Sequence, residues 1–347
     1  MNKASDKVFP RKDSIMRISK NEPGRKDAPR PRSRSVFTSS NSANDEAAAN
    51  RDMMKLEGTL SWLTYIPKPI TVKNYMTEDF NNYYGYDSYQ VSGTVISPHG
   101  VITLHLNEQI RVDISLDRAV RVTNAKNGIV LVLSSSGSYS GLIHPNGRVY
   151  QDGSRVEIMA IDSQGNDKFA KMWFKGVSFS SMQSALVYLV DSAGTRTTTD
   201  SFDDLSQIDF TLDIFKKDSQ YLGQKPCPTT TTQLVHEAVG FLQTTTYWYT
   251  DDCTQNWIIN NVRISQTADG LVRVGRNSNK FSLRTSPTNG SASISSPYIH
   301  CTGSMGQTRH LFVRRGERRM HYDGTTFIVR NAGHSAGFNE KHELKVY

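Results

Sequence analysis

The segment that decides the fold is "LIHPNGRVYQDGSRVEIMAID", which runs from Leu142 to Asp162. It contains two glycine-bearing turn signals, Asn146-Gly147 and Asp152-Gly153, six residues apart. Such dipeptides favour two-residue hairpin turns because they adopt positive φ angles with little strain. The spacing leaves one short strand, Arg148 to Gln151, between the turns. The segment therefore predicts a three-stranded antiparallel meander.

The alternation that follows the second turn predicts which side chains are buried. Successive side chains of a strand point to opposite faces. We therefore expect Val156, Ile158 and Ala160 to face a core, and Glu157 to occupy an ordinary solvent-facing position. His144 precedes the first turn, where we expect a polar residue at a strand end.

Similar units of turn plus strand recur along the chain, as in "SPHGVITL", "AKNGIVLV", "TADGLVRV" and "HYDGTTFIV". Each has a polar residue, a glycine and then a run rich in β-branched residues, which favour strands. The recurrence predicts a mainly β protein with antiparallel meanders and hairpin-rich sheets, in one or two β domains, with few short helices. "LVHEAVGFLQ" (residues 234–243) has apolar spacing that favours a helix, with a strand as the alternative.

Composition divides the chain into successive regions. The expected regions are a disordered basic tail (1–44), a short helix (45–57), a first β-rich region (58–222), a linker (223–233) and a second β-rich region (234–347). The linker is proposed because "GQKPCPTTTTQ" concentrates proline and threonine.

The positive charge is concentrated in the tail. Residues 1–34 hold 11 Lys and Arg against 4 Asp and Glu, which leaves 30 basic and 29 acidic residues in the rest of the chain. A body that binds nucleic acid usually carries the excess charge itself, so nucleic-acid binding is disfavoured. Residues that could contact a partner are basic residues of the tail and of the hairpin tip "RRGERR": Arg30, Arg32, Arg34, Arg314, Arg315, Arg318 and Arg319.

Motifs for catalysis or cofactor binding are missing from the sequence. No GxSxG elbow or phosphate-binding loop occurs, and "VHEAVG" fails as a zinc motif because Gly240 stands where HExxH needs histidine. Three widely spaced cysteines form no CxxC pair. We expect a protein without enzymatic activity, cofactor or metal. A hydrolase with a site around His144 is an alternative, and replacing that histidine would abolish its catalysis.

Aromatic residues cluster in two runs. One extends from Tyr65 to Tyr89, and the other is "TYWYTDDCTQNW", which contains Trp248 and Trp257. Aromatic surfaces anchor protein interfaces and also stack on sugars. Packing or a protein interface is favoured, and a carbohydrate-binding β module is the alternative.

Two stretches carry a resemblance to a known family. "GRVYQDGSRVEIMAID…KFAKMWFKGVSFSS…ALVYLVDSAGTRTTTDSF" (147–202) resembles the β-rich region of the sperm-associated antigen 17 family, and "DGTTFIVRNAGHSAGF" (323–338) is similar. The resemblance covers roughly residues 90–340. It implies a structural component of the axonemal central pair apparatus, in a C1a-type projection, that supports ciliary or sperm-flagellar motility. Its partners would be other central-apparatus proteins, and the family offers no catalytic residues.

The expected location follows from these features. Neither a secretory signal nor a membrane span is recognised, so we expect a soluble protein of the cytoplasm, cytoskeleton and axoneme. Strand edges could accept another chain. The basic tail could contact an acidic microtubule surface in a salt-sensitive way. A nuclear or RNA-associated protein acting through this tail is a further alternative.

Overall fold

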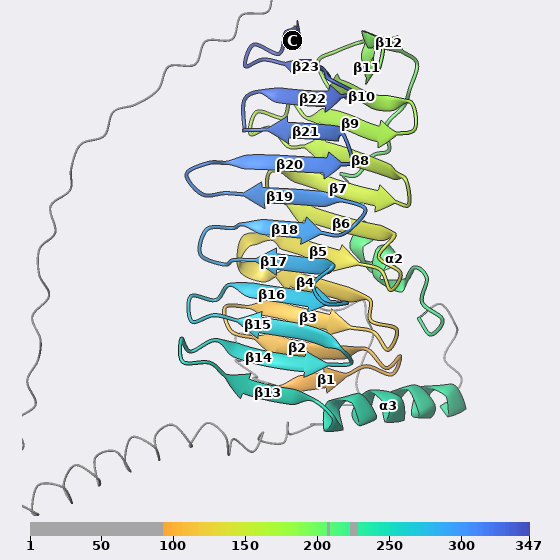
Figure 1. The fold of residues 1–347 in the computed structure, drawn as a ribbon, viewed down its shortest axis with the longest axis vertical. Coiled ribbons are helices and arrows are strands. Elements are labelled where there is room, and N and C mark those ends of the chain that lie inside the picture. The colour runs from red at the N-terminus through yellow and green to blue at the C-terminus, as the bar shows by residue number, and fades with distance from the viewer. Residues whose placement is uncertain (1–92, 207–208, 223–227) are drawn as a thin grey trace, which may run out of the picture. The chain divides into compact units, whose positions relative to one another are not determined.

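A computed structural model gives the structure of residues 93–206, 209–222 and 228–347 (Figure 1). The chain divides into two units, residues 1–64 and residues 65–347, and all described residues belong to the second. The expected tail with Arg30, Arg32 and Arg34, the helix at 45–57 and the aromatic run from Tyr65 to Tyr89 lie outside the described residues.

The first sheet, sheet A, is an antiparallel meander in which each strand pairs with the next strand of the chain. Its strands are β1 (Thr94–Ile96), β2 (Ile102–Leu106), β3 (Ile110–Ile114), β4 (Val120–Asn124), β5 (Ile129–Leu133), β6 (Tyr139–His144), β7 (Gly147–Asp152), β8 (Arg155–Ala160), β9 (Lys168–Trp173), β10 (Gly176–Ser181), β11 (Val187–Asp191) and β12 (Gly194–Thr198). A single 3-10 turn, η1 (Ala125–Asn127), lies between β4 and β5.

The second sheet, sheet B, repeats this arrangement. Its strands are β13 (Thr246–Tyr249), β14 (Gln255–Ile259), β15 (Val262–Gln266), β16 (Val272–Arg276), β17 (Phe281–Thr285), β18 (Ala292–Ser295), β19 (His300–Ser304), β20 (His310–Arg315), β21 (Arg318–Tyr322), β22 (Phe327–Asn331), β23 (His334–Phe338) and β24 (Leu344–Val346). Each sheet has 12 strands in chain order, which confirms the predicted mainly β, hairpin-rich fold.

The two turns of the segment 142–162 differ by one residue from the prediction. His144 pairs with Gly147, so the first turn consists of Pro145 and Asn146, and β7 is longer than the predicted strand. The glycine is required by a close approach rather than by the turn, because a Cβ on Gly147 would lie 2.2 Å from the carbonyl oxygen of Met159. In the second turn Asp152 pairs with Arg155, which leaves Gly153 and Ser154 as the turn residues.

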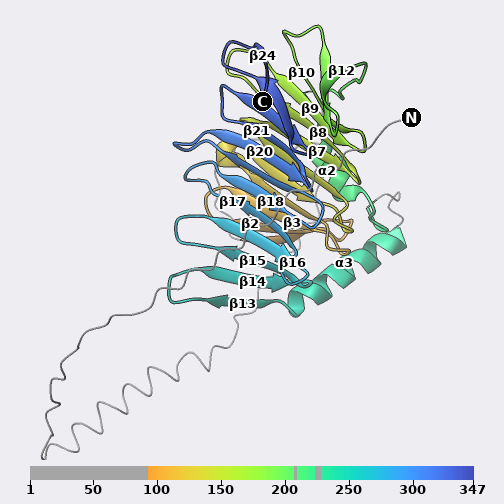
Figure 2. The same cartoon turned by 45° about the horizontal axis from the view of Figure 1, so that its top comes forward.

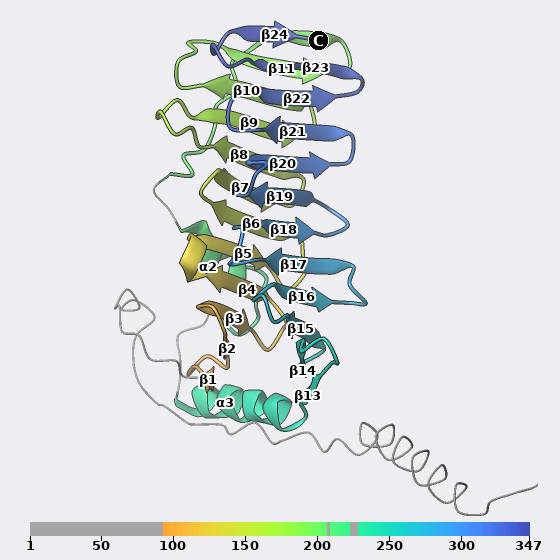
Figure 3. The same cartoon turned by 90° about the vertical axis from the view of Figure 1, so that its left-hand side faces the viewer.

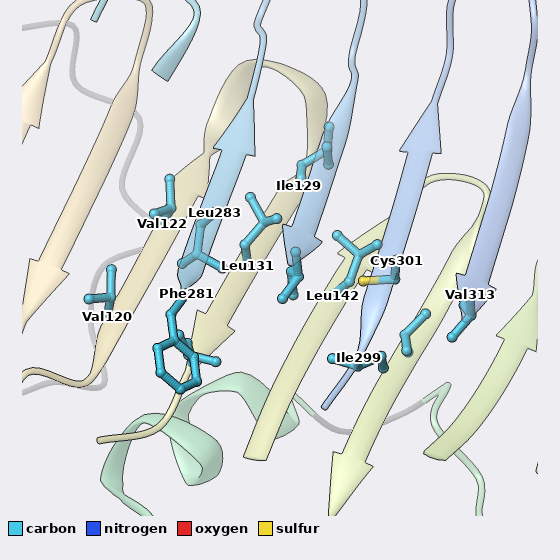
Figure 4. Packing of buried hydrophobic residues seen from close by; sticks show 14 of the residues in the cluster. Val120, Val122, Ile129, Leu131, Leu142, Phe281, Leu283, Ile299, Cys301 and Val313 are labelled. Atoms are coloured by element: carbon cyan, nitrogen blue, oxygen red, sulfur yellow. The ribbon is translucent and has the colours of Figure 1, made fainter. Parts of the chain in front are cut away.

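The two sheets pack face to face, and strands of sheet A lie near strands of sheet B about twelve places later in the chain (Figures 2 and 3). Contacts join β5 to β17, β10 to β22 and β11 to β23. Apolar side chains of both inner faces fill the space between them. Figure 4 shows Leu131 and Leu142 of sheet A lying near Leu283 and Cys301 of sheet B. The two β-rich regions therefore share one core.

That core contains the residues that the alternation predicted. Val156, Ile158 and Ala160 are all buried in it, as expected. Burial raises the pKa of the Cys301 thiol to about 12, so this cysteine stays protonated and packs as a small apolar residue.

Two helices connect the sheets. Helix α3 (Pro228–Gln243) begins inside the expected linker and follows the β1 and β13 end of the sheets (Figures 1 and 3). It confirms the helical interpretation of "LVHEAVGFLQ", and its Leu234, Ala238 and Leu242 join the core at helical spacing. Helix α2 (Phe210–Lys216) instead contacts β5 and β6 on the outer face of sheet A.

Polar side chains also connect the inner faces of the sheets. His144 lies at the end of β6, as predicted, but it is buried rather than exposed to solvent. Its Nδ1 accepts the Asn146 N–H (3.0 Å), so its Nε2 donates to the carbonyl oxygen of Gly290 in sheet B (2.9 Å). Burial lowers the pKa of His144, which favours this neutral ring. The reason for its burial is that sheet B covers the end of the hairpin.

Asn146 is the centre of this connection, and replacing it tests its contribution to stability. Its Nδ2 donates to the carbonyl oxygens of Ser304 (2.6 Å) and His310 (2.9 Å), and its Oδ1 accepts from Arg309 Nε (2.8 Å). We expect Asn146→Ala to lower the free energy of unfolding by about 2–4 kcal/mol, because three partners lose a buried or partly buried hydrogen bond. Urea denaturation measures this loss. Asn289 is exposed, so Asn289→Ala is the control and should lower the free energy of unfolding by under about 1 kcal/mol. Equal losses for the two variants would contradict the expectation.

Candidate functional site

The outer face of sheet B is built from two rows of side chains that cross every neighbouring strand. Residues directly opposite in an antiparallel pair point to the same side. The first row is Trp248, Asn256, Ser265, Arg273, Arg284, Ser293, Thr302, Phe312, His321, Ile328, Gly337 and Lys345. The second row is Thr246, Ile258, Arg263, Gly275, Ser282, Ser295, His300, Arg314, Arg319, Arg330 and Ser335. We call these two rows the basic face.

The charge of this face has one sign. The strands β13 to β24 contain neither Asp nor Glu. The basic face carries Arg263, Arg273, Arg284, Arg314, Arg319, Arg330 and Lys345, all of which are exposed. The body of the protein is nearly neutral as a whole, so the structure concentrates positive charge that the composition hides.

Several of these arginines lie directly opposite one another. Arg273 pairs with Arg284, and Arg319 lies between Arg314 and Arg330. Cβ atoms at such positions are about 4.5–5.5 Å apart, and like charges there destabilise a sheet. Within the described ranges, none of the six arginines forms an ion pair. The fold therefore tolerates an unfavourable arrangement along this face.

Acidic groups near the basic face lie in turns at its margins, and Glu343 of the β23–β24 turn forms an ion pair with Lys345 (3.7 Å). Asp269 lies in the β15–β16 turn and interacts with Arg284 through charge alone. Asp323, in the β21–β22 turn, accepts from Thr325 and Thr326. Partial burial raises its pKa, but these hydrogen bonds outweigh burial and bring it down to about 2. These carboxylates leave the centre of the face unneutralised.

Aromatic and hydroxyl side chains occupy the space between the arginines. Phe312 is half-buried between His300 and His321, with ring centroids 6.3 and 6.4 Å away. Thr302 Oγ1 lies 3.1 Å from His310 Nε2. Burial and then the charge of Arg314 lower the pKa of His300, so this histidine is neutral near pH 7. The face thus offers apolar contacts and hydrogen bonds beside its guanidinium groups.

The structure divides the predicted hairpin "RRGERR" into two pairs. Arg314 and Arg319 belong to the basic face, whereas Arg315 and Arg318 point toward sheet A. Arg315 Nη1 donates to the carbonyl oxygen of Gly153 (3.2 Å), and Arg318 Nη2 donates to that of Phe174 (3.4 Å). The inward pair also lines an open pocket of about 340 Å³ beside Tyr298 and Asn331. These two arginines join the sheets.

Four arginines of the basic face are absent from the sequence-based set: Arg263, Arg273, Arg284 and Arg330. Their signal lies in "VRIS", "LVRV", "SLRT" and "IVRN", where an arginine alternates with apolar residues and lacks an acidic neighbour. Taken alone, each segment indicates only that its arginine faces solvent. Only the pairing of the strands places the four arginines on the same face of sheet B.

The outer face of sheet A contrasts with the basic face because its charges are balanced. Asp113 pairs with Arg111 (2.9 Å), and Glu157 pairs with Arg155 (2.6 Å). The expectation of a solvent-facing Glu157 is wrong, because only 1% of it is exposed. Arg155 and Lys171 lie against its carboxylate, and both also bond to residues 201–203. Burial raises the pKa of Glu157 to about 7, against the opposing effects of Arg155 and Lys171.

The described residues hold no group of three or more His, Cys, Asp or Glu side chains that could bind a metal ion. Their helices include none that is long and apolar enough to cross a membrane. Trp257 packs in the core, and Trp248 lies beneath Arg263, whose guanidinium carbon is 5.7 Å from its ring centre. The carbohydrate alternative therefore has no exposed pair of tryptophans in this run.

Residues 94–340 match a family described as "Domain of unknown function (DUF8796)". Because the match covers more than half of the chain, the protein belongs to this family. No curated protein matches the chain.

Among solved structures, the chain is similar to two centriole-protein domains. The first is the wild-type TCP10 domain of Danio rerio CPAP in complex with a peptide of STIL, with 8% identity, coverage of 71% of this chain and 98% of that chain, and a TM-score of 0.23. The second is the SAS-4 (dCPAP) TCP domain of Drosophila melanogaster with a proline-rich motif of Ana2, with 10% identity, coverage of 69% and 88%, and a TM-score of 0.16. TM-scores this low do not establish a common fold.

Proposed function

We propose that the protein is a non-enzymatic structural component that works through protein–protein contacts, with the basic face as its docking surface. The observation that carries the proposal is the row of directly opposed, unpaired arginines on a face without carboxylates. Such an arrangement destabilises a sheet on its own. An acidic partner would turn the repulsion into attraction, and charge complementarity of this kind guides association.

The resemblance to the sperm-associated antigen 17 family supports a more specific proposal. The protein would be a component of the axonemal central pair apparatus that contributes to ciliary or flagellar motility. Stacked sheets with long rows of side chains suit a scaffold, since they present several contact positions on one rigid surface. The basic tail would add a salt-sensitive contact with microtubules.

Localisation of a tagged full-length chain in motile ciliated cells tests the proposal. We expect the tag along the axoneme, and we expect the triple variant R284Q/R319Q/R330Q to be lost from it. The matched control K175Q/K280Q/K341Q removes three exposed lysines from hairpin turns and should stay. Nuclear accumulation of the wild-type chain, or equal axonemal signals for both variants, would overturn the proposal.

A further inference from the structure

The chain itself covers a charged sheet face with one of its own segments. Residues 200–206 cross the outer face of sheet A and lead to α2. Ser178 of β10 donates to Asp200, Lys171 of β9 donates to the carbonyl oxygen of Ser201, and Arg155 of β8 donates to Asp203 (3.0 Å). We call residues 200–206 and 209–213 the covering segment. It crosses successive strands instead of extending the sheet at an edge.

The same pattern continues toward α2. Arg148 of β7 donates to the carbonyl oxygen of Leu205 (2.7 Å), and Arg121 of β4 donates to Asp209 (3.2 Å). The segment therefore advances one strand for every one or two residues along β10 to β7. Its carboxylates and carbonyl oxygens accept from a serine hydroxyl on β10 and from basic side chains on β9, β8, β7 and β4.

Apolar residues alternate with these carboxylates and hold the covering segment down. Phe202 packs against Phe169 (5.9 Å between ring centroids), and Phe210 packs against Tyr150 (5.5 Å). Leu205 and Phe210 are buried in a second apolar cluster on this outer face. The sequence "DSFDDLSQIDFTLD" thus combines charge neutralisation with apolar anchoring. The five aspartates of this stretch suggest a solvated loop, but its apolar residues are packed against sheet A and its end forms helix α2.

The basic face presents the same two kinds of contact without an occupant among the described residues. Arg314, Arg319 and Arg330 are adjacent on three successive strands. Phe312 and Ile328 lie in the neighbouring row and are half-buried. Neighbouring strands are about 4.8 Å apart, so each row extends roughly 50 Å. That length accommodates a segment at least as long as the covering segment.

We infer that the basic face binds an extended acidic segment of a partner protein, with aromatic or large aliphatic residues between its carboxylates, laid across the strands. This inference rests on the proposed function and specifies the chemistry of the partner. It favours polypeptide over nucleic acid because the covering segment shows this mode of contact within the same molecule. A nucleic acid would supply phosphates, but the covering segment's contacts use carboxylates together with intervening side chains.

A labelled peptide of the sequence "DSFDDLSQIDFTLD" is the probe, measured by fluorescence anisotropy with the full-length protein. We expect binding that weakens at least tenfold in R314Q/R319Q/R330Q and stays unchanged in K175Q/K280Q/K341Q. A peptide with asparagine at every aspartate should not bind. A peptide with serine at its Phe, Leu and Ile positions should bind several-fold more weakly. This comparison separates the contribution of the apolar side chains to binding from that of the carboxylates.

Other outcomes would overturn the inference. Peptide binding that is equal in both protein variants would place the contact elsewhere. Tighter arginine-dependent binding of a single-stranded RNA of matched charge would assign the face to nucleic acid. Peptide binding that occurs only in E78Q/D79N/D87N would assign it to this chain's own acidic, tyrosine-rich stretch at 75–90. Failure of peptide binding with arginine-dependent axonemal localisation intact would reject this inference and leave the proposed function standing.

Discussion

Phe179→Ala is expected to lower the free energy of unfolding by about 3–5 kcal/mol. Phe179 is fully buried between the sheets, with its ring 5.5 Å from Phe338 of sheet B and 5.4 Å from Tyr188. Removing the ring leaves a cavity that rigid strands on both sides cannot close, so the loss includes both apolar transfer and lost contacts. Urea denaturation followed by circular dichroism measures the change.

A neighbouring phenylalanine provides the control for this substitution. Phe174, in the turn between β9 and β10, is 79% exposed although it touches Trp173. Phe174→Ala should change stability by no more than about 0.5 kcal/mol, as surface substitutions usually do. Similar losses for both variants would contradict the stacked-sheet core. A folded state that keeps sheet A intact after sheet B unfolds would contradict the single shared core.

Arg319→Glu is expected to stabilise the fold and to weaken partner binding. Arg319 lies directly opposite both Arg314 and Arg330, so the substitution converts two like-charge pairs into opposite-charge pairs. We expect a gain of roughly 0.5–1 kcal/mol in the free energy of unfolding. Affinity for an acidic partner should fall roughly 10- to 100-fold, because a like charge now faces the partner.

This opposition between stability and binding distinguishes a docking surface from an ordinary sheet face. Lys280→Glu reverses an exposed charge in the β16–β17 turn and should leave both quantities nearly unchanged. Thermal denaturation and peptide titration of the same protein samples provide the two measurements. An Arg319→Glu protein that binds as tightly as the wild type would exclude this row from the interface. A destabilised protein would show that repulsion between these arginines is negligible.

The strands and their order could be predicted from local sequence because hairpin formation is itself local. Turn residues at short intervals, together with alternating apolar residues, specify antiparallel neighbours along the chain. The exact turn at Pro145 and Asn146 was missed because Gly147 serves a close approach to Met159 in β8. That contact comes from a neighbouring strand, so the turn dipeptide alone does not reveal it.

Local sequence does not predict how the sheets stack or that the arginines share the basic face. His144 and Glu157 look like ordinary surface residues in their own strands, but both are buried, His144 against Gly290 of sheet B and Glu157 beside Arg155 and Lys171. The basic face depends on register over twelve strands and on the absence of carboxylates from all of them. The net charge of the body does not reveal the basic face, because acidic residues of the turns and of sheet A balance its arginines.

Co-pelleting of the full-length protein with isolated axonemes tests most directly whether the basic face is the docking surface. The wild-type chain, R284Q/R319Q/R330Q and K175Q/K280Q/K341Q would be compared at low and at physiological salt. We predict that the arginine variant stays in the supernatant, while the wild type and the lysine variant pellet and are released as salt rises. Pelleting of the arginine variant to the same extent as the wild type would contradict the account.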